Sequence, residues 1–165
     1  LVEVGRNVDG YVLSTWITLS ENDVLGMGPV WDYNGALGNA SYFKAWETEG
    51  WHYQNPEFPG DNPNGFCWYE ALLDSPEFLT LRQERWQMHR EEAWSDTAIE
   101  ARIDEAIAVL EPAVNRNFEQ WPLLGEVIWP NDDGAVDRMT YVDEVSYLKS
   151  WVKQRVAWMD FVLSG

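Results

Sequence analysis

The stretch that decides the fold runs Tyr11-Val-Leu-Ser-Thr-Trp-Ile-Thr-Leu19, then the polar Glu21-Asn-Asp23, then Val24-Leu-Gly-Met-Gly-Pro-Val-Trp31. The first segment is rich in β-branched and aromatic residues, which favour extended backbone. The polar triplet is typical of a turn. The second segment can therefore return beside the first, and its glycines and Pro29 predict a short, bent or edge strand. We expect a β-hairpin formed by strands 11–19 and 24–31.

The rest of the chain is predicted to form a long loop followed by helices. Residues 33–65 hold Gly, Pro, Asn and aromatic residues without clear periodicity, which is typical of a long ordered loop. From residue 66 onward apolar residues recur at helical spacing. We therefore expect a single α+β domain over residues 1–165, mainly helical, with a short N-terminal β-hairpin, a long loop and a helical bundle.

Three short motifs mark where these helices should begin. Ser75-Pro76 combines a capping serine with proline at the first helical position. Thr97-Ala-Ile-Glu100 has the spacing of a capping box, and Thr140-Tyr-Val-Asp143 opens the last helix. Pro112 should kink or restart the helix that follows residue 97, because proline cannot donate a backbone hydrogen bond.

Composition narrows the possible partners. The 165 residues contain 11 Lys and Arg against 28 Asp and Glu, a net charge of −17. Phosphate backbones need clustered basic residues, so nucleic acid is not an expected partner. No apolar run is long enough to span a membrane. A hydrophobic fraction of 45% excludes a disordered acidic tail.

Two acidic residues bracket the hairpin. Asp9 stands just before the first predicted strand, in Arg6-Asn-Val-Asp-Gly10, and Asp32 stands just after the second. If the strands pair, the two carboxylates meet at one end of the ribbon, where their repulsion favours a bound divalent cation. Asp residues at these places also suit a turn or a helix cap, so the pattern alone leaves both interpretations open.

The same arrangement follows the logic of a kinase active site. There, one Asp on a catalytic loop orients the substrate hydroxyl, and a second Asp after the next hairpin holds Mg²⁺ against the nucleotide phosphates. In protein kinases an Asn five residues after the first Asp helps to hold a second metal ion. At that offset from Asp9 this sequence has Ser14.

Beyond this spacing, the sequence resembles the spore-coat protein H (CotH) kinase family along nearly its whole length. The most specific segment is Gly28-Pro-Val-Trp-Asp-Tyr-Asn34. The other similar segments are Asn7-Val-Asp-Gly-Tyr11, Ser14-Thr15, Ala36-Leu-Gly-Asn39, Trp68 through Phe78, Arg85-Trp86, Asn115-Arg-Asn117, Trp121-Pro122, and Glu144 through Asp160.

The resemblance implies an atypical protein kinase that transfers phosphate from ATP to a protein hydroxyl with Mg²⁺ or Mn²⁺. By position, Asp9 matches the catalytic aspartate, and Asp32 with Asn34 the metal-binding positions. It further implies a secreted protein, extracellular or on a cell or spore surface. Its partner would be a protein substrate or a surface-assembly component.

The sequence departs from the family pattern in three ways. Family members often carry a second Asp where Asn34 stands, and some have an amide where Ser14 stands. The nucleotide-binding half is expected upstream of Leu1, so the chain would be a C-terminal, kinase C-lobe-like fragment that is inactive in isolation. All three lysines follow Asp32. Apolar surface exposed by such a division would allow oligomers.

The eleven tryptophans support an alternative, a non-catalytic binding or structural module in a cell-surface or carbohydrate-associated assembly. Indole rings stack well on sugar rings and on peptide anchors. Trp86, Trp151 and Trp158 lie on or near apolar helical stripes and are expected in the core. Trp46 and Trp51, in the loop that follows Trp31, are the better candidates for an exposed platform.

Overall fold

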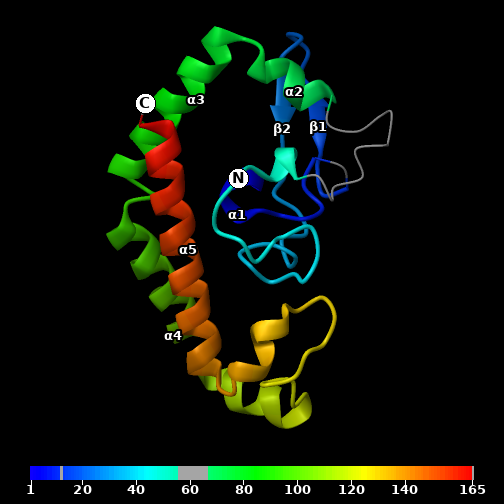
Figure 1. Cartoon of the computed structure of the whole chain (residues 1–165), viewed down its shortest axis with the longest axis vertical. Coiled ribbons are helices and arrows are strands. Elements are labelled where there is room, and N and C mark those ends of the chain that lie inside the picture. Colours follow the sequence, from blue (N-terminus) through cyan, green and yellow to red (C-terminus); the bar gives the residue numbers. More distant parts are fainter. Residues whose placement is uncertain (12, 56–66, 165) are drawn as a thin grey trace.

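The computed structural model describes residues 1–11, 13–55 and 67–164 (Figure 1). Its helices and strands confirm the predicted α+β, mainly helical class. The elements in chain order are α1 (Val2–Gly5), β1 (Ile17–Leu19), β2 (Leu25–Met27), the 3₁₀ helix η1 (His52–Gln54), α2 (Cys67–Leu73), α3 (Pro76–Glu91), α4 (Asp96–Gln120), the 3₁₀ helix η2 (Asp133–Asp137) and α5 (Tyr141–Leu163).

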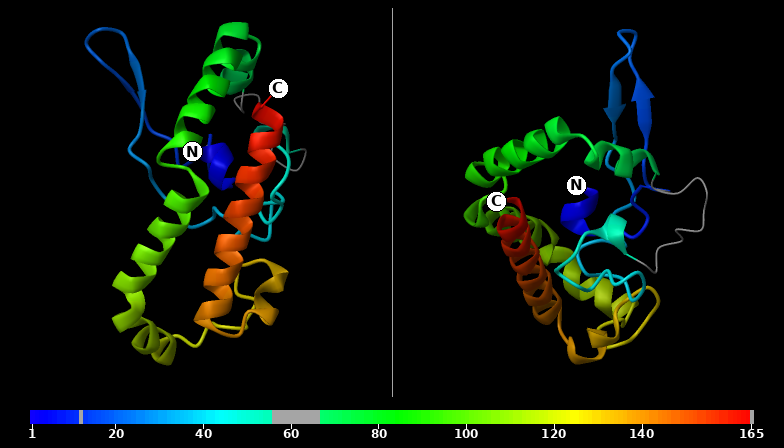
Figure 2. Two further views of the ribbon diagram at one scale, coloured as in Figure 1. Left: turned by 90° about the vertical axis from the view of Figure 1, so that its left-hand side faces the viewer. Right: turned by 45° about the horizontal axis from the view of Figure 1, so that its top comes forward.

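The predicted hairpin is present, with shorter strands than expected. β1 and β2 pair antiparallel, with Thr18 opposite Gly26, and Ser20 and Val24 close the turn. Each strand has only three residues, so the predicted limits 11–19 and 24–31 are wrong. In the first part of the predicted first strand, ahead of β1, the backbone forms a turn instead. There the N–H groups of residues 13 and 14 donate to the carbonyl of Asp9. The hairpin projects away from the helices (Figure 2).

The long loop is also largely as expected. Residues 33–51 form turns and bends, and η1 follows at residues 52–54. The last part of the predicted loop, residues 56–66, lies outside the described residues.

Two of the three predicted helix starts agree with the structure. The Ser75 hydroxyl accepts a hydrogen bond from the N–H of Phe78, and Thr140 forms a reciprocal capping box with Asp143. The third start is wrong: α4 begins at Asp96, and its cap is the Ser95 hydroxyl, which accepts from the N–H of Ala98.

Of the kink or restart predicted at Pro112, the restart does not occur, since α4 continues through this residue to Gln120. Proline removes the hydrogen bond to the carbonyl four residues earlier, which here belongs to Ala108. Ala108 is exposed, so water can satisfy its carbonyl. α4 has no buried residue along its length, and its apolar side rests partly on α5.

The main apolar core gathers on α5. Its Trp151, Val152, Val156, Met159 and Leu163 are buried together with Trp86 of α3. A polar contact reinforces this packing, because the indole N–H of Trp86 donates to Asp160 at 2.9 Å and the Arg90 guanidinium binds the same carboxylate. The predicted core positions of Trp86 and Trp151 are therefore confirmed.

The predicted aromatic platform is only partly exposed. Trp31 and Trp46 are exposed at 57% and 42% of their surfaces. Trp51, in contrast, is half-buried, with its ring edge-on to Trp158 at 5.0 Å and beneath the Arg82 guanidinium. Trp51 is therefore part of the packing around α5 rather than an exposed face. Among the helices described, none is long and apolar enough to cross a membrane.

Candidate functional site

The candidate site forms where two loop segments run beside each other, residues 5–9 after α1 and residues 32–37 after the hairpin. The segments are joined by hydrogen bonds rather than by a regular strand ladder. These bonds tie the residues that flank Asp9 to those that follow Asp32. They are Leu37 N to Gly5 O at 2.7 Å, Val8 N to Gly35 O at 3.5 Å, and Asn7 Nδ2 to Asp32 O at 3.4 Å.

The backbone of Asp9 is fixed within its loop. Its N–H donates to the side-chain oxygen of Asn7 at 3.4 Å, and its carbonyl accepts from the N–H groups of Leu13 and Ser14. Asn7 is fully buried, so this side chain fixes both the Asp9 backbone and the carbonyl of Asp32. The Asp9 carboxylate itself is half-buried. It therefore combines a fixed backbone with partial access to solvent.

The electrostatics place Asp9 and Asp32 within reach of each other. Burial raises the pKa of the Asp9 carboxyl above its usual range, and the negative charge of Asp32 raises it further. The pKa of the Tyr42 hydroxyl is raised by burial and then by the charge of Asp9. A cation between the two carboxylates would relieve their repulsion.

Asp32 and Asn34 lie on the exposed side of this loop pair. Asp32 adopts a left-handed backbone conformation with φ of 57°, which Asp tolerates better than most residues. The carbonyl of Asn34 accepts from the side-chain amide of Asn39 at 2.9 Å. Within the described part of the chain, the Asn34 side chain makes no hydrogen bond. The structure thus joins the segments that carry Asp9 and Asp32, lets the charge of Asp32 act on Asp9, and leaves the Asn34 amide uncommitted among the described residues.

The buried carboxylate of Glu3 holds the loop that carries Asp9 in place. This role was not predicted from the sequence. The Glu3 oxygens accept hydrogen bonds from the Tyr11 hydroxyl at 2.8 Å and from the backbone N–H groups of His52 and Tyr53. Tyr11 lies two residues after Asp9, so Glu3 links the loop that carries Asp9 to η1. An acidic residue in the apolar run Leu1-Val-Glu-Val4 was the available signal.

Arg155 of α5 completes this support. Its guanidinium is fully buried and donates to the carbonyls of Glu3, Thr48 and Gly50 at 2.6–3.0 Å. It also lies 3.5 Å from the Glu3 carboxylate. Burial lowers the pKa of Arg155 to about 10. The only sequence signal was a charged residue beside Val152, Val156 and Met159 on an otherwise apolar helix face, so Arg155 too was missed.

The acidic residues near Asp9 suit a metal ion that is bound partly by a nucleotide better than one bound by protein ligands alone. Among the described residues, no group of three or more His, Cys, Asp or Glu could hold a metal ion. Mg²⁺, however, is usually bound by one or two carboxylates together with substrate phosphates and water. Asp32, with the exposed Asn34 amide two residues later, could contribute to such a site, and the charge of Asp32 reaches the Asp9 carboxyl.

Comparison with known proteins identifies the family. The family model described as CotH kinase protein matches residues 1–159, which is nearly the whole chain. No curated protein and no solved structure matches the chain. The matched range includes Asp9, Asp32, Asn34 and the helix that carries Arg155. By this match, the chain belongs to the CotH kinase family.

Proposed function

We propose that this chain carries the catalytic-loop and metal-binding part of an ATP-dependent protein kinase. The observation that supports the proposal is the effect of the Asp32 charge, which raises the pKa of the Asp9 carboxyl. The two segments that carry them are also joined by hydrogen bonds through Asn7. The family of the chain is consistent with this assignment.

In the proposed reaction, Asp9 acts on the substrate hydroxyl. The hydroxyl oxygen forms a bond to the γ-phosphorus of ATP while the bond from that phosphorus to the β–γ bridging oxygen breaks, so ADP leaves. The hydroxyl proton passes to the Asp9 carboxylate. A raised pKa makes this carboxylate a better proton acceptor than an ordinary Asp.

Asp32 would hold Mg²⁺ or Mn²⁺, with Asn34 as a neutral second ligand. When bound, such an ion neutralises charge on the β- and γ-phosphates. One carboxylate and one amide offer a smaller negative charge than two carboxylates, so we expect weaker metal binding than in relatives with Asp at the position of Asn34.

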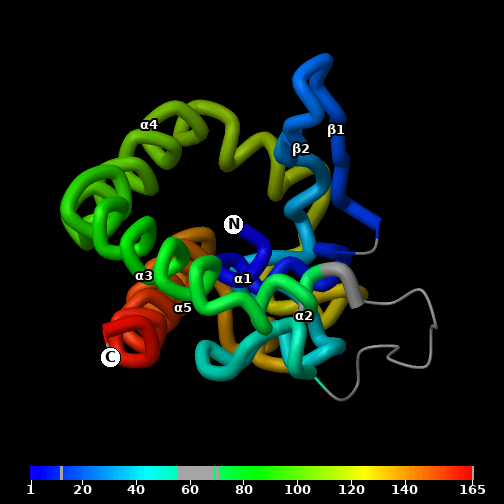
Figure 3. Tube along the Cα trace, turned by 90° about the horizontal axis from the view of Figure 1, so that it is seen from above, coloured from blue at the N-terminus to red at the C-terminus, as the bar shows by residue number. Residues whose placement is uncertain are grey.

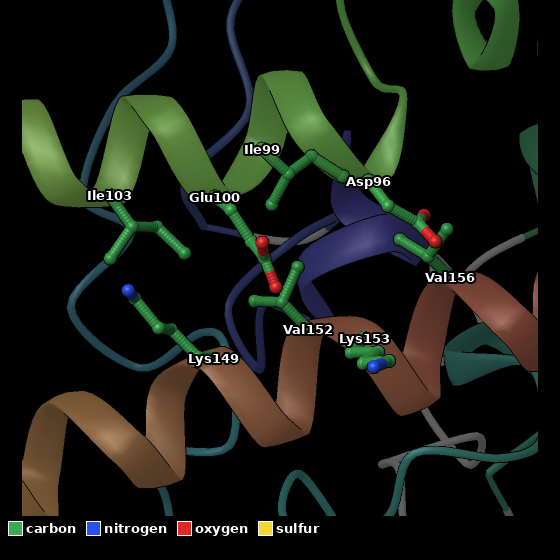
Figure 4. Close-up of a pocket in the computed structure, with 8 residues that line it drawn as sticks. All are labelled: Asp96, Ile99, Glu100, Ile103, Lys149, Val152, Lys153 and Val156. Carbon is green, nitrogen blue, oxygen red and sulfur yellow. The ribbon is translucent and has the colours of Figure 1, made fainter.

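The proposed kinase reaction also needs a lysine that binds the ATP phosphates, and the lysines of this chain are poorly placed for that role. Lys149 is paired with Asp104 at 2.5 Å, and Lys149 and Lys153 both line a small pocket between α4 and α5 (Figure 4). This leaves Lys44 as the third lysine of the chain. We therefore expect slow or absent phosphotransfer by residues 1–165 alone. The family further suggests a protein substrate and an extracellular or spore-surface location.

Metal binding tests this function directly. Mn²⁺ with ATP is titrated into the wild-type chain, Asp32→Ala and the matched control Asp137→Ala, and bound Mn²⁺ is followed by electron paramagnetic resonance. We expect Asp32→Ala to weaken Mn²⁺–ATP binding about tenfold or more, as for the loss of a charged ligand. The control should bind as the wild type does. Equal binding by all three would remove Asp32 from the metal role.

A second candidate function, a carbohydrate-associated binding module, draws on the exposed indoles of Trp31 and Trp46. Flat aromatic faces of this kind stack on sugar rings. A glycan screen read by tryptophan fluorescence, with Trp31→Ala for comparison, distinguishes the two functions. Sugar-dependent quenching that is lost in Trp31→Ala and is unaffected by Mn²⁺ would favour the binding module.

A further inference from the structure

A large apolar cavity, separate from the Asp9–Asp32 pair, lies between α1, the base of the hairpin, α2, α3 and the end of α5. Its volume is about 760 Å³. The view from above shows α3, α2 and the hairpin around α1 (Figure 3). Most of its walls are aromatic or aliphatic, including Trp51, Phe78, Trp86 and Met159.

One cation in this cavity lacks a counter-charge. Arg82 of α3 has its Nε and Nη1 atoms buried, and neither has a hydrogen-bond partner in the described part of the chain. The guanidinium lies over the ring of Trp51, 5.0 Å from its centre. A buried donor without a partner is costly, and a buried guanidinium more so. An anionic group placed beside these two nitrogens would satisfy them.

Among the described residues, the cavity offers Arg82 no free acidic group. The one carboxylate that these residues place in the wall is that of Glu3, whose oxygens are engaged by Tyr11, η1 and Arg155. Arg85 adds a second guanidinium to the wall. In a chain with net charge −17, this is a locally basic, apolar surface.

The apolar surface also continues beyond the cavity onto the hairpin. Trp16, Met27 and Val30 line the cavity and remain 55–64% exposed. Ile17 and Leu25 extend the exposed apolar area along both strands. A small molecule that filled the cavity would leave this surface in water. Tryptophan, methionine and arginine are the residues enriched at protein interfaces, so the larger surface favours a polypeptide.

We propose that this cavity and the adjoining base of the hairpin bind an amphipathic helix of a partner protein, with a carboxylate that pairs with Arg82. An apolar wall offers no hydrogen-bond partners to the backbone of a bound peptide. A helix needs none, because its backbone groups bond to one another. Its apolar side chains at i, i+3, i+4 and i+7 would enter the cavity, as in other helix-in-groove complexes. The proposal does not depend on phosphotransfer, because neither Asp9 nor Asp32 contributes to this surface.

The test uses two fluorescent synthetic helices of about five turns, or about 18 residues. Both have leucine on one face and uncharged polar residues on the other. One carries a single Glu at the centre of the leucine face, and its match carries Gln there. Binding is measured by fluorescence anisotropy at about 0.15 M salt, where long-range charge effects are screened.

The wild-type chain should bind the Glu helix about tenfold more tightly than the Gln helix, as expected for one charge-assisted pair. Arg82→Met should abolish this preference, and Arg102→Met, an exposed change on α4, should retain it. Circular dichroism checks folding, and Arg82→Gln replaces Arg82→Met if the latter does not fold. The proposal is overturned if neither helix binds, if both bind wild type equally, or if the preference survives in the Arg82 variant. A dimer that persists in excess Glu helix during sedimentation would assign the surface to a second copy and also overturn it.

Discussion

The region around Asp9 and the region between α3 and α5 are held together in different ways. Around Asp9 a small apolar cluster of Val8, Ala40 and Ala45 is buried, but most of the large buried side chains are polar or charged: Glu3, Arg6, Asn7, His52 and Arg155. Between α3 and α5 they are mainly apolar. Apolar packing tolerates small shifts, whereas hydrogen bonds fix direction and distance. The polar region is therefore suited to hold two repelling carboxylates in place, and it should be the less tolerant of substitution.

The comparison predicts that the largest loss follows removal of Arg155. Arg155→Met leaves the buried Glu3 carboxylate without the positive charge beside it and removes the Arg155 donors to the carbonyls of Glu3 and Gly50. We expect a loss of about 3–5 kcal/mol in the free energy of unfolding, as for other broken buried pairs. Urea unfolding followed by circular dichroism measures it. Lys153→Met, on the exposed side of the same helix, is the control. A loss no larger than that of the control would contradict the distinction between the regions.

A pH titration probes the same polar region through His52. Burial, and then the charges of Arg6 and Arg155, lower the pKa of His52 from 6.5 to about 4. The unfolded chain therefore takes up a proton at higher pH than the folded chain does. Stability attributable to His52 is complete above pH 6.5 and is lost as the pH falls toward 4, by about 3 kcal/mol in total.

His52→Gln isolates this contribution. The variant should show a flatter fall in the free energy of unfolding between pH 6.5 and pH 4 than the wild type, measured by urea unfolding at each pH. Carboxylates titrate in both proteins, so only the difference between the two curves is informative. Parallel curves would mean that His52 does not become protonated over this range.

A substitution in the apolar region between α3 and α5 should lower the free energy of unfolding by less than Arg155→Met does. Val156→Ala removes two methyl groups from a residue that is 2% exposed within the α5 core. We expect a loss of about 2 kcal/mol from lost burial and the remaining cavity. A loss above that of Arg155→Met would reverse the proposed order of the two regions, and thermal unfolding of both variants decides it.

The smallest effect is expected at the start of α4, on the surface. Ser95→Ala removes the cap at the helix start and should cost about 1 kcal/mol, whereas Thr97→Ala should cost only a few tenths. Helix content and urea midpoint compare the two variants. Equal losses of stability in the two variants would contradict the assignment of the cap to Ser95 alone and would support the cap at Thr97 that the sequence spacing predicted.

Local signals were sufficient for much of the fold. The turn at residues 20–24, the caps at Ser75 and Thr140, and the apolar stripe of α5 each depend on neighbouring residues. Local signals failed where two signals competed. Ser95 and Thr97 both suit a cap, and a proline inside a helix does not always end it, as α4 shows at Pro112.

The support of the candidate site could not be predicted, for a different reason. Counting along the chain predicted Asp9 and Asp32 at the same end of a hairpin, although the strands are shorter than that count assumed. Glu3 and Arg155 meet across 152 positions of sequence, and no periodicity reports such a contact. A lone charge in an apolar run indicates that a partner is needed but not which residue supplies it.

The same separation has a consequence for synthesis of the protein. Glu3 leaves the ribosome long before the helix that carries Arg155 is made, so Glu3 is without its buried counter-ion until then. Closing so long a loop is entropically unfavourable and slow compared with forming a helix. We therefore expect the helices of the nascent chain to form first, and the segment that joins Glu3 to Asp9 to reach its final position when α5 docks.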